Sequence, residues 1–228
     1  MDLSSLIFVA LFVAWAVYLI PMALRRHEED ASSRSVDGFS ERLRVLARRD
    51  PALRAMVRHH GVPPIVPGRR GSHFATLARA VCFQQLAGRA AATIHGRFEA
   101  LFDGPPTARG VLALPPGALR SAGLSGAKAA SITDLAERVE TGTLRLHGIG
   151  RLPDDEVVTA LTAVRGIGEW TAQMFLMFRL GRLDVWPVLD LGVRVGHARL
   201  FDLPAPLAPR DLSAAGEPFR PYRSLVAW

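Results

Sequence analysis

Two glycines that bracket one isoleucine constrain this chain most. They lie in the stretch V-R-G-I-G-E-W-T-A-Q-M-F, residues 164–175, between two segments whose apolar residues recur at helical spacing. Gly166 and Gly168 let the backbone turn sharply and come close to another surface, because neither carries a Cβ atom. The pattern predicts a helix–hairpin–helix unit. The simpler alternative is a plain connector between packed helices.

The same tripeptide occurs again at residues 148–150, but in a different context. There it is preceded by L-R-L-H and followed by R-L-P-D-D, without the incoming and outgoing apolar patterns. This second copy therefore predicts an ordinary loop, and only residues 166–168 are expected to form a hairpin.

The expected hairpin suits a polyanion. Thr171 lies near the start of the second helix, where free backbone N–H groups and the helix dipole attract phosphate. Such contacts hold a DNA backbone without reading its sequence. The expected DNA contacts along the hairpin are Arg165, Gly166, Ile167, Gly168 and Thr171. The carbonyl oxygens of Val164 and Gly166 are candidate ligands for a monovalent cation that bridges to phosphate.

The distribution of charge agrees with a nucleic-acid partner. Residues 1–50 hold seven basic and seven acidic residues, so the whole net charge of +7 belongs to residues 51–228. A basic domain favours a polyanion, although an arginine-rich composition with Lys128 as the only lysine also produces such an excess. Cys82 is the only cysteine, which excludes an intrachain disulfide and any cysteine-built zinc or iron–sulfur cluster.

The amino terminus predicts a membrane anchor. Residues 3–24 contain no charged residue, and about 20 apolar residues suffice to cross a bilayer as a helix. Arg25 and Arg26 follow at once, which places the rest of the chain in the cytoplasm, at the inner face of the membrane. A buried core helix is the alternative. We expect an anchor at residues 1–26, a polar linker at 27–44 and one domain at 45–228.

The pattern of that domain is all-α. Asp50-Pro51 and Ser72 are start signals for helices. No long segment alternates with period two, so no strand is expected. Further helices are predicted at residues 89–101, 107–113, 126–140, 154–164, 169–180, 190–200 and 209–214.

Four segments together resemble the helix–hairpin–helix (HhH-GPD) DNA glycosylases, in the branch of 3-methyladenine DNA glycosylase II. They are FATLARAVCFQQLAGRAA, LTAVRGIGEWTAQMFLM, DVWPVLDLGVR and FRPYRS, and they span about residues 48–228. The resemblance implies release of alkylated purines from damaged double-stranded DNA in base-excision repair. The enzyme is expected to be a monomer that works in the cytoplasm, at the nucleoid, without a cofactor or an iron–sulfur cluster, apart from the candidate cation at the hairpin. The resemblance also implies a closing helix that is shorter here than in the family.

The resemblance places the catalytic aspartate at Asp190, and elementary chemistry agrees. Breaking an N-glycosidic bond builds positive charge on the sugar, which a nearby carboxylate stabilises while it orients the attacking water. Asp184 is the competing carboxylate, at a position that the family uses structurally. Bifunctional relatives carry an attacking lysine where this chain has Trp170, so a monofunctional hydrolase is expected.

The base must leave the duplex before it is cut. The segment Gln84, Gln85 and Leu86 matches the family's wedge, with Gln85 as the residue that fills the gap, or merely as the cap of a turn. Aromatic faces suit an electron-poor base, and the candidates for the base pocket are Trp186, Tyr222 and Trp170.

Residues 1–49 resemble the membrane anchor of a bacterial divisome-associated protein family. The two resemblances together predict a glycosylase joined to a membrane anchor, either by natural fusion or through a misdrawn gene boundary. The alternative from another class is a non-catalytic, membrane-attached DNA-binding protein. A mismatch glycosylase for adenine or thymine is disfavoured because the cysteines of its iron–sulfur cluster are missing.

Overall fold

The computed structural model describes residues 36–61, 71–86 and 88–228. It divides the chain into two compact units, Met1–Val66 and Pro67–Trp228. The expected membrane span at residues 3–24 lies outside the described residues, and so does the first part of the expected linker. Among the helices that are described, none combines the length and apolar character needed to cross a bilayer.

In the first unit, helix α2 (Val36–Arg49) packs against α3 (Pro51–His60). The linker expected up to residue 44 is therefore helical from residue 36. Its polar composition concealed an amphipathic helix, because Leu43 and Leu46 are buried while Arg44 and Arg48 of the same helix are exposed. The start signal at Asp50 is confirmed, since its Oδ1 accepts the backbone N–H groups of Ala52 and Leu53 at 2.9 and 3.0 Å.

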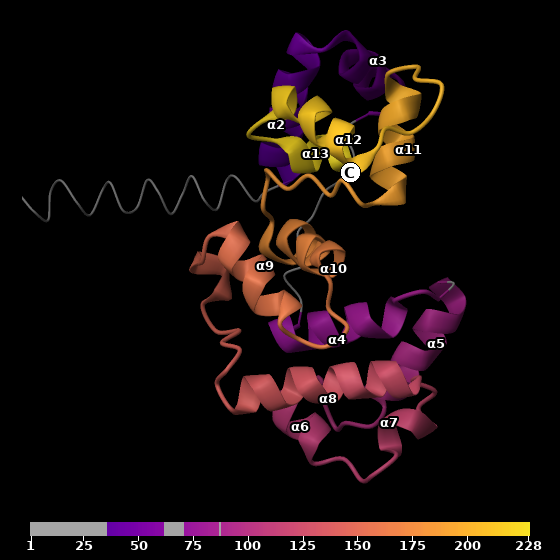
Figure 1. The fold of residues 1–228 in the computed structure, drawn as a ribbon, viewed down its shortest axis with the longest axis vertical. Helices are drawn as coiled ribbons and strands as arrows, with labels where there is room; N and C mark the ends of the chain where they lie inside the picture. The colour runs from indigo at the N-terminus through magenta and orange to yellow at the C-terminus, as the bar shows by residue number, and fades with distance from the viewer. Residues whose placement is uncertain (1–35, 62–70, 87) are drawn as a thin grey trace, which may run out of the picture. The chain divides into compact units, whose positions relative to one another are not determined.

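Every regular element described in the second unit is helical, which confirms the all-α prediction (Figure 1). The α-helices are α4 (His73–Phe83), α5 (Gly88–Glu99), α6 (Ala108–Leu112), α7 (Ala118–Ser121), α8 (Gly126–Glu140), α9 (Asp154–Thr162), α10 (Glu169–Met174), α11 (Leu191–Leu200), α12 (Pro209–Ala215) and α13 (Arg223–Ala227). The shorter elements are η1 (Ile149–Arg151), η2 (Phe175–Leu180) and η3 (Glu217–Phe219), of which η2 continues α10 with π-helical bonding. The sequence did not predict α7, η1 or η3, whereas α13 lies where the resemblance implied a short closing helix.

Helices α4 and α8 form the centre of the core, and α6 packs on α8 (Figure 1). Side-chain caps fix where both begin: the hydroxyl of Ser72 accepts the N–H of Ala75, and that of Ser125 accepts the N–H of Lys128. Apolar side chains of α9 and α10 join the same core. This core therefore holds both sides of the glycine turn.

Burial makes the stability of this unit depend on pH. The pKa values of His73, His95 and His197 are lowered, in each case chiefly because burial disfavours the charged imidazolium. The unfolded chain therefore takes up protons before the folded chain as the pH falls. The contribution of these neutral histidines to the free energy of unfolding is fully present above the ordinary histidine pKa of about 6.5. It is lost as the pH falls below that value.

His197 should dominate this effect. It is 8% exposed in α11, its Nδ1 has no hydrogen-bond partner among the described residues, and its ring lies 4.7 Å from that of Phe201. We expect chemical denaturation to need less denaturant at about pH 5.5 than at about pH 7.5. His197→Phe should reduce that difference, whereas removal of the exposed His147 should leave it unchanged. Equal pH sensitivity of the wild type and His197→Phe would contradict this assignment.

Candidate active site

The glycine turn lies between α9 and α10, as expected for a helix–hairpin–helix unit. Gly166 adopts a φ of +75°, and a Cβ there would collide with the Ser131 hydroxyl and lie 3.2 Å from the Ser131 Cβ. Gly168 has a φ of −91°, and the space around it is open. The turn therefore requires glycine at position 166, where the backbone is left-handed and a Cβ would collide. At Gly168 the absence of a side chain leaves room for an approaching surface.

Helix α8 fixes the hairpin, defined here as residues 164–171. The backbone N–H of Arg165 donates to Asp134 Oδ2 at 2.8 Å, and Nε of Arg138 donates to the same oxygen at 2.9 Å. The Arg165 N–H bond is the main reason that the pKa of Asp134 lies below its usual value. Ile167 and Thr171 are buried, at 3% and 5% exposure. Their side chains therefore pack inside the protein and offer little surface to a partner.

The second copy of the tripeptide leads into the single turn η1, so the expected loop is confirmed. Gly148 caps η1 with a φ of +80°, and no helix enters from its N-terminal side. The Gly150 carbonyl accepts a hydrogen bond from Arg182 Nη2 at 3.0 Å. This site is a loop anchored to the segment after η2.

Asp190 immediately precedes α11, and both of its carboxylate oxygens are engaged. Oδ1 accepts the backbone N–H of Val193 at 2.9 Å, which caps the helix, and Oδ2 accepts Trp170 Nε1–H at 2.6 Å. The flanking Leu189 and Leu191 are 58% and 67% exposed. The carboxylate thus has a fixed orientation, and the residues on either side of it in the sequence are exposed and apolar. Their exposure could not be predicted from the sequence.

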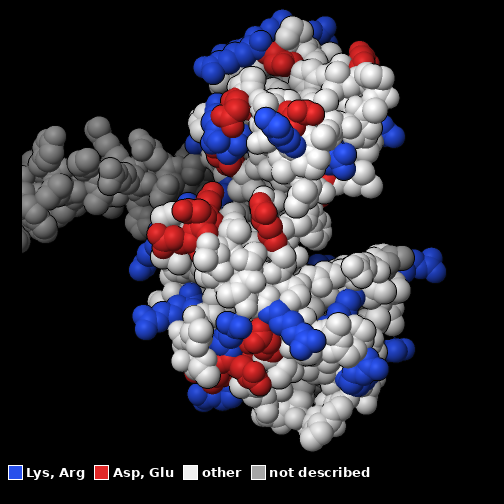
Figure 2. Space-filling model, in the orientation of Figure 1, with Lys and Arg blue, Asp and Glu red and all other residues white. Residues whose placement is uncertain are grey.

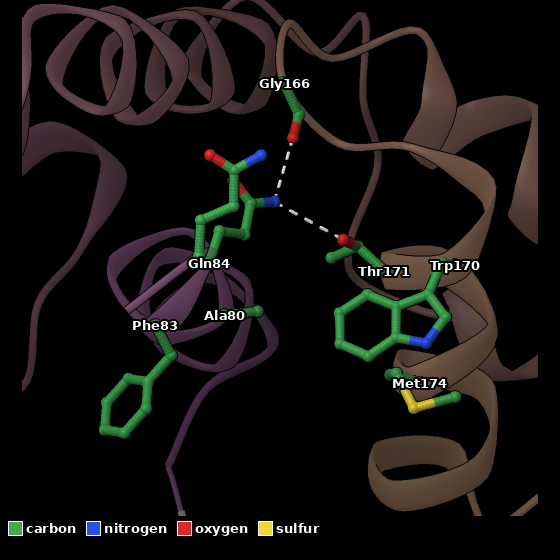
Figure 3. Close-up of a pocket in the computed structure, with 8 residues that line it drawn as sticks. Ala80, Phe83, Gln84, Gly166, Trp170, Thr171 and Met174 are labelled. Atoms are coloured by element: carbon green, nitrogen blue, oxygen red, sulfur yellow. Dashed lines mark hydrogen bonds between the residues drawn. The ribbon is translucent and has the colours of Figure 1, made fainter. Parts of the chain in front are cut away.

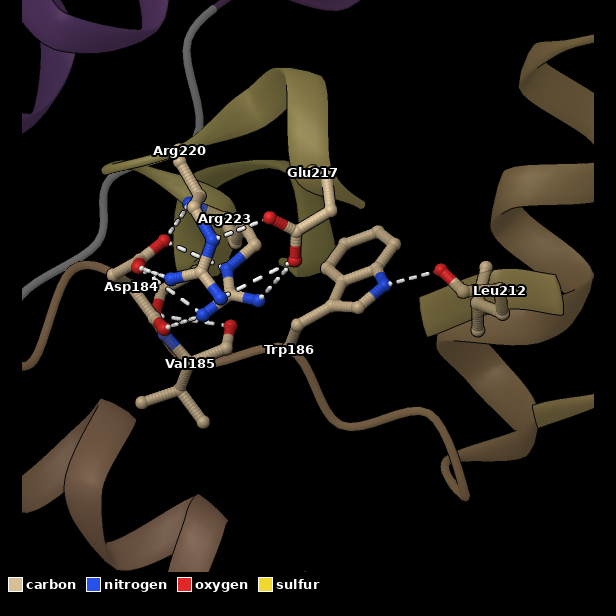
Figure 4. Close-up of polar contacts among 8 residues, drawn as sticks. Asp184, Val185, Trp186, Leu212, Glu217, Arg220 and Arg223 are labelled. Atoms are coloured by element: carbon tan, nitrogen blue, oxygen red, sulfur yellow. Dashed lines mark hydrogen bonds and ion pairs between the residues drawn. The ribbon is translucent and has the colours of Figure 1, made fainter. Parts of the chain in front are cut away.

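Asp184 has a structural environment instead (Figure 4). Its carboxylate pairs with Arg220 Nη1 at 2.6 Å and with Arg223 Nε at 2.7 Å, and Glu217 joins the same cluster. Ser224 adds bonds to both polar groups of the Val185 backbone. The cluster connects α13 to the segment that leads to Asp190. The Asp184 carboxylate is therefore occupied by ion pairs with two guanidinium groups.

A pocket of about 460 Å³ opens beside the hairpin (Figure 3). No charged residue lines it; the lining residues are Ala80, Phe83, Gln84, Gln85, Gly166, Trp170, Thr171 and Met174. Trp170, which is 43% exposed, both lines this pocket and bonds to Asp190. Ala80, Phe83 and Met174 were not predicted as pocket residues, because their helical spacing resembles that of ordinary core residues.

Two of the three expected pocket aromatics are not brought to this pocket. Trp186 is 7% exposed, and its Nε1–H donates to the Leu212 carbonyl at 2.8 Å (Figure 4). Its ring centroid lies 6.1 Å from that of Phe219. The buried indole fills the space beneath α12. Tyr222 is half-buried at the start of α13 and does not line the pocket. Of the three aromatics, only Trp170 lies in the pocket.

The residues of the wedge turn, 84–86, follow the end of α4. The side-chain amide of Gln84 donates to the Gly166 carbonyl at 2.9 Å and points toward Thr171 Oγ1 at 3.4 Å (Figure 3). Gln84 thus bonds to the hairpin rather than facing outward for DNA. Gln85 is exposed with a φ of +53°, and Leu86 is 40% exposed.

The two carbonyls proposed as cation ligands already have donors. The Val164 carbonyl accepts the N–H of Ile167 at 3.1 Å, and the Gly166 carbonyl accepts the Gln84 amide. Each carbonyl oxygen has a second lone pair that these bonds leave available, so the cation site at Val164 and Gly166 stays a prediction. Among the described residues, no group of His, Cys, Asp and Glu side chains is arranged to hold a metal ion.

On the face shown in Figure 2, Lys and Arg side chains are scattered across the lower part of the view, where α5 to α8 lie. Arg165 is exposed at the hairpin itself. Such a distribution suits contacts to several phosphates along a backbone.

Two family models match different parts of the chain. Residues 78–220 match the HhH-GPD superfamily of base excision DNA repair proteins, and residues 3–72 match the gephyrin-like molybdotransferase receptor GlpR. The GlpR match ends at residue 72, whereas the glycosylase domain was expected to begin at residue 45. The assignment of residues 45–72 to that domain remains a prediction.

Curated relatives agree with the first match. The chain is 34% identical to DNA-3-methyladenine glycosylase 1 of Schizosaccharomyces pombe over 67% of its own length and 68% of that protein. It is 31% identical to a putative DNA-3-methyladenine glycosylase of Bacillus subtilis over 78% of its length and 64% of the relative.

Solved structures share the fold. The Schizosaccharomyces pombe 3-methyladenine DNA glycosylase in complex with abasic DNA matches with a TM-score of 0.73 and 30% identity, over 82% of this chain and 93% of that one. A DNA-3-methyladenine glycosidase of Bacillus halodurans matches with a TM-score of 0.71 and 31% identity, over 82% and 85%. With its hairpin, its capped aspartate and these matches, the chain belongs to the HhH-GPD superfamily of base excision DNA repair proteins.

Proposed function

We propose that this protein is a monofunctional DNA glycosylase, which hydrolyses the N-glycosidic bond of alkylated purines of the 3-methyladenine type. The observation that carries the proposal is the bond between Trp170 and Asp190 at the edge of an uncharged pocket. One indole thereby brings together an aromatic surface for a base and a carboxylate for the sugar. The names of the relatives supply the substrate class.

The proposed chemistry follows from the position of Asp190. As the bond between the sugar and the base breaks, positive charge develops on the sugar, and the carboxylate stabilises it. Water then adds to the sugar, its proton is removed with help from the carboxylate, and an abasic site and a free base remain. The Val193 N–H and the Trp170 indole hold the carboxylate in one orientation, so little reorganisation is needed.

The pocket suits an electron-poor purine. Its apolar part consists of the Trp170 and Phe83 rings and the Met174 thioether, all of which interact favourably with a flat or cationic base. No fixed charge in the lining repels a positively charged ring. Gln85 and Leu86, both exposed in the wedge turn, are proposed to occupy the gap left in the duplex.

The deciding experiment is a glycosylase assay on duplex DNA treated with a methylating agent, using the purified chain. Release of free methylated purines supports the proposal. Binding of the same DNA without base release would instead favour the non-catalytic DNA-binding alternative.

We expect base release without formation of a covalent intermediate. Trp170 has no amine to attack the sugar, and the amine of Lys128 donates to the carbonyls of Cys82 and Gln84 at 2.8 and 2.7 Å. Borohydride treatment during the reaction should therefore trap no protein–DNA adduct, whereas a bifunctional glycosylase run in parallel should be trapped. A trapped adduct would overturn the monofunctional assignment.

The proposed place of action is the nucleoid, by a monomer, with the anchor at residues 3–24 attaching the protein to the inner face of the membrane. The length of the uncharged segment and the two arginines after it support this location.

A further inference from the structure

A second set of contacts at the site is centred on Lys128, the only lysine in the sequence. Lys128 lies near the start of α8, and its Nζ reaches across to the end of α4. There it donates to the carbonyls of Cys82 at 2.8 Å and of Gln84 at 2.7 Å. One side chain thus joins two helices that are separated by more than forty residues in the sequence.

These contacts meet a physical need of α4. The last carbonyls of a helix have no partner within the helix, and a cation near the C-terminal end also interacts favourably with the helix dipole. Hydrogen bonds from an ammonium group are stronger than those between neutral groups. The Lys128 side chain is half-buried, so water competes with these bonds only in part. The backbone at Gln84 is therefore firmly fixed.

The side chain of Gln84 is held from the other side. Its side-chain amide donates to the Gly166 carbonyl at 2.9 Å, while the backbone carbonyl of Gln84 accepts from Lys128. The next residue, Gln85, is exposed and has a φ of +53°. A residue other than glycine keeps such a conformation only when its surroundings impose it. The contacts from Lys128 and from the hairpin both hold Gln84, the residue immediately before Gln85.

We propose that Lys128 is a positioning residue for base extrusion: it fixes Gln84 against the hairpin and so keeps Gln85 raised in the conformation that enters the duplex. This inference rests on the proposed function. An inserted side chain that is ordered in advance loses less conformational entropy when it enters the DNA stack. Lys128 does not line the base pocket. Its loss should therefore slow extrusion of a paired base and leave the cleavage step unchanged.

The test compares two substrates for full-length wild type and Lys128→Met under single-turnover conditions. One duplex carries 7-methylguanine paired with cytosine, and the other carries the same base opposite an abasic site, where extrusion costs less. We expect Lys128→Met to release the paired base about tenfold more slowly, the size of effect expected for the loss of one charge-assisted contact. The unpaired base should be released at nearly the wild-type rate. Lys128→Arg keeps a charged hydrogen-bond donor and should recover part of the lost rate on the paired base.

Arg120 provides the matched control. Its Nη1 donates to the Leu124 carbonyl at 2.6 Å after α7, which is the same kind of contact in another turn. Arg120→Met should leave the ratio of the two rates unchanged.

Equal slowing of Lys128→Met on both substrates, or no slowing on either, would overturn the inference while the proposed function stands. If the wild type releases neither base, both fail together. If Lys128→Met does not fold, Lys128→Gln, which removes the charge and shortens the side chain, takes its place. That variant must then release the paired base more slowly than the wild type and the unpaired base at nearly the wild-type rate. A wild-type rate on the paired base would count against the inference.

Discussion

Asp190→Asn should reduce base release by about 10³-fold or more, because the neutral amide no longer stabilises the positive charge of the transition state. The structure adds a local consequence. Asp190 accepts both Val193 N–H and Trp170 Nε1–H, but an asparagine amide has only one oxygen. Either the helix cap or the indole bond is therefore lost. Single-turnover release of methylated purine, with duplex affinity measured in parallel, tests this expectation.

Asp184→Asn is the matched control for that experiment. It makes the same chemical change six residues earlier, at a carboxylate that pairs with Arg220 and Arg223. It should lower the thermal unfolding midpoint, because α13 is held through these pairs, and leave the rate of the folded enzyme near that of the wild type. The roles of Asp190 and Asp184 would be exchanged if Asp184→Asn lost base release and Asp190→Asn kept it.

Local signals in the sequence predicted most of the helices. Asp50 and Ser72 start α3 and α4 as expected, because a cap depends only on residues within one turn. Two apolar patterns around a glycine pair likewise located the hairpin. Helix α2 was partly missed, because its first turns are polar and small in composition and its apolar face becomes evident only near Leu43.

The side-chain assignments at the site were less predictable, because they depend on contacts between distant residues. Nothing near Trp186 indicates that its indole is buried beneath α12, whereas Trp170 stays half-exposed next to the pocket. The bond from Gln84 to Gly166 and the bonds from Lys128 to α4 each join elements far apart in the chain. Spacing rules describe one helix at a time, so they could identify Gln84 as a site residue without revealing its partner.

Gly166→Ala should lower the free energy of unfolding by about 3 kcal/mol, since it combines a left-handed backbone with overpacking. The new Cβ would collide with the Ser131 hydroxyl, which itself donates to the Ala127 carbonyl. Ser131→Ala removes that hydroxyl and should recover part of the loss in the double variant. Urea denaturation of the two single variants and the double variant measures this coupling. Strictly additive effects would show that Ser131 does not limit the turn.

Gly168→Val tests the other glycine of the turn. Here we expect a small effect on stability and a larger effect on DNA binding. Its φ of −91° suits any residue and no atom lies within contact of the added Cβ, so the variant should lose only about 1 kcal/mol, from a poorer cap of α10. The same open space is where a phosphate would approach the first turn of α10. Affinity for undamaged duplex should therefore fall by about tenfold at fixed salt, because an added isopropyl group blocks a backbone contact that carries no sequence information. Unchanged affinity in the folded variant would mean that residues 166–168 only connect two helices and that DNA is held elsewhere.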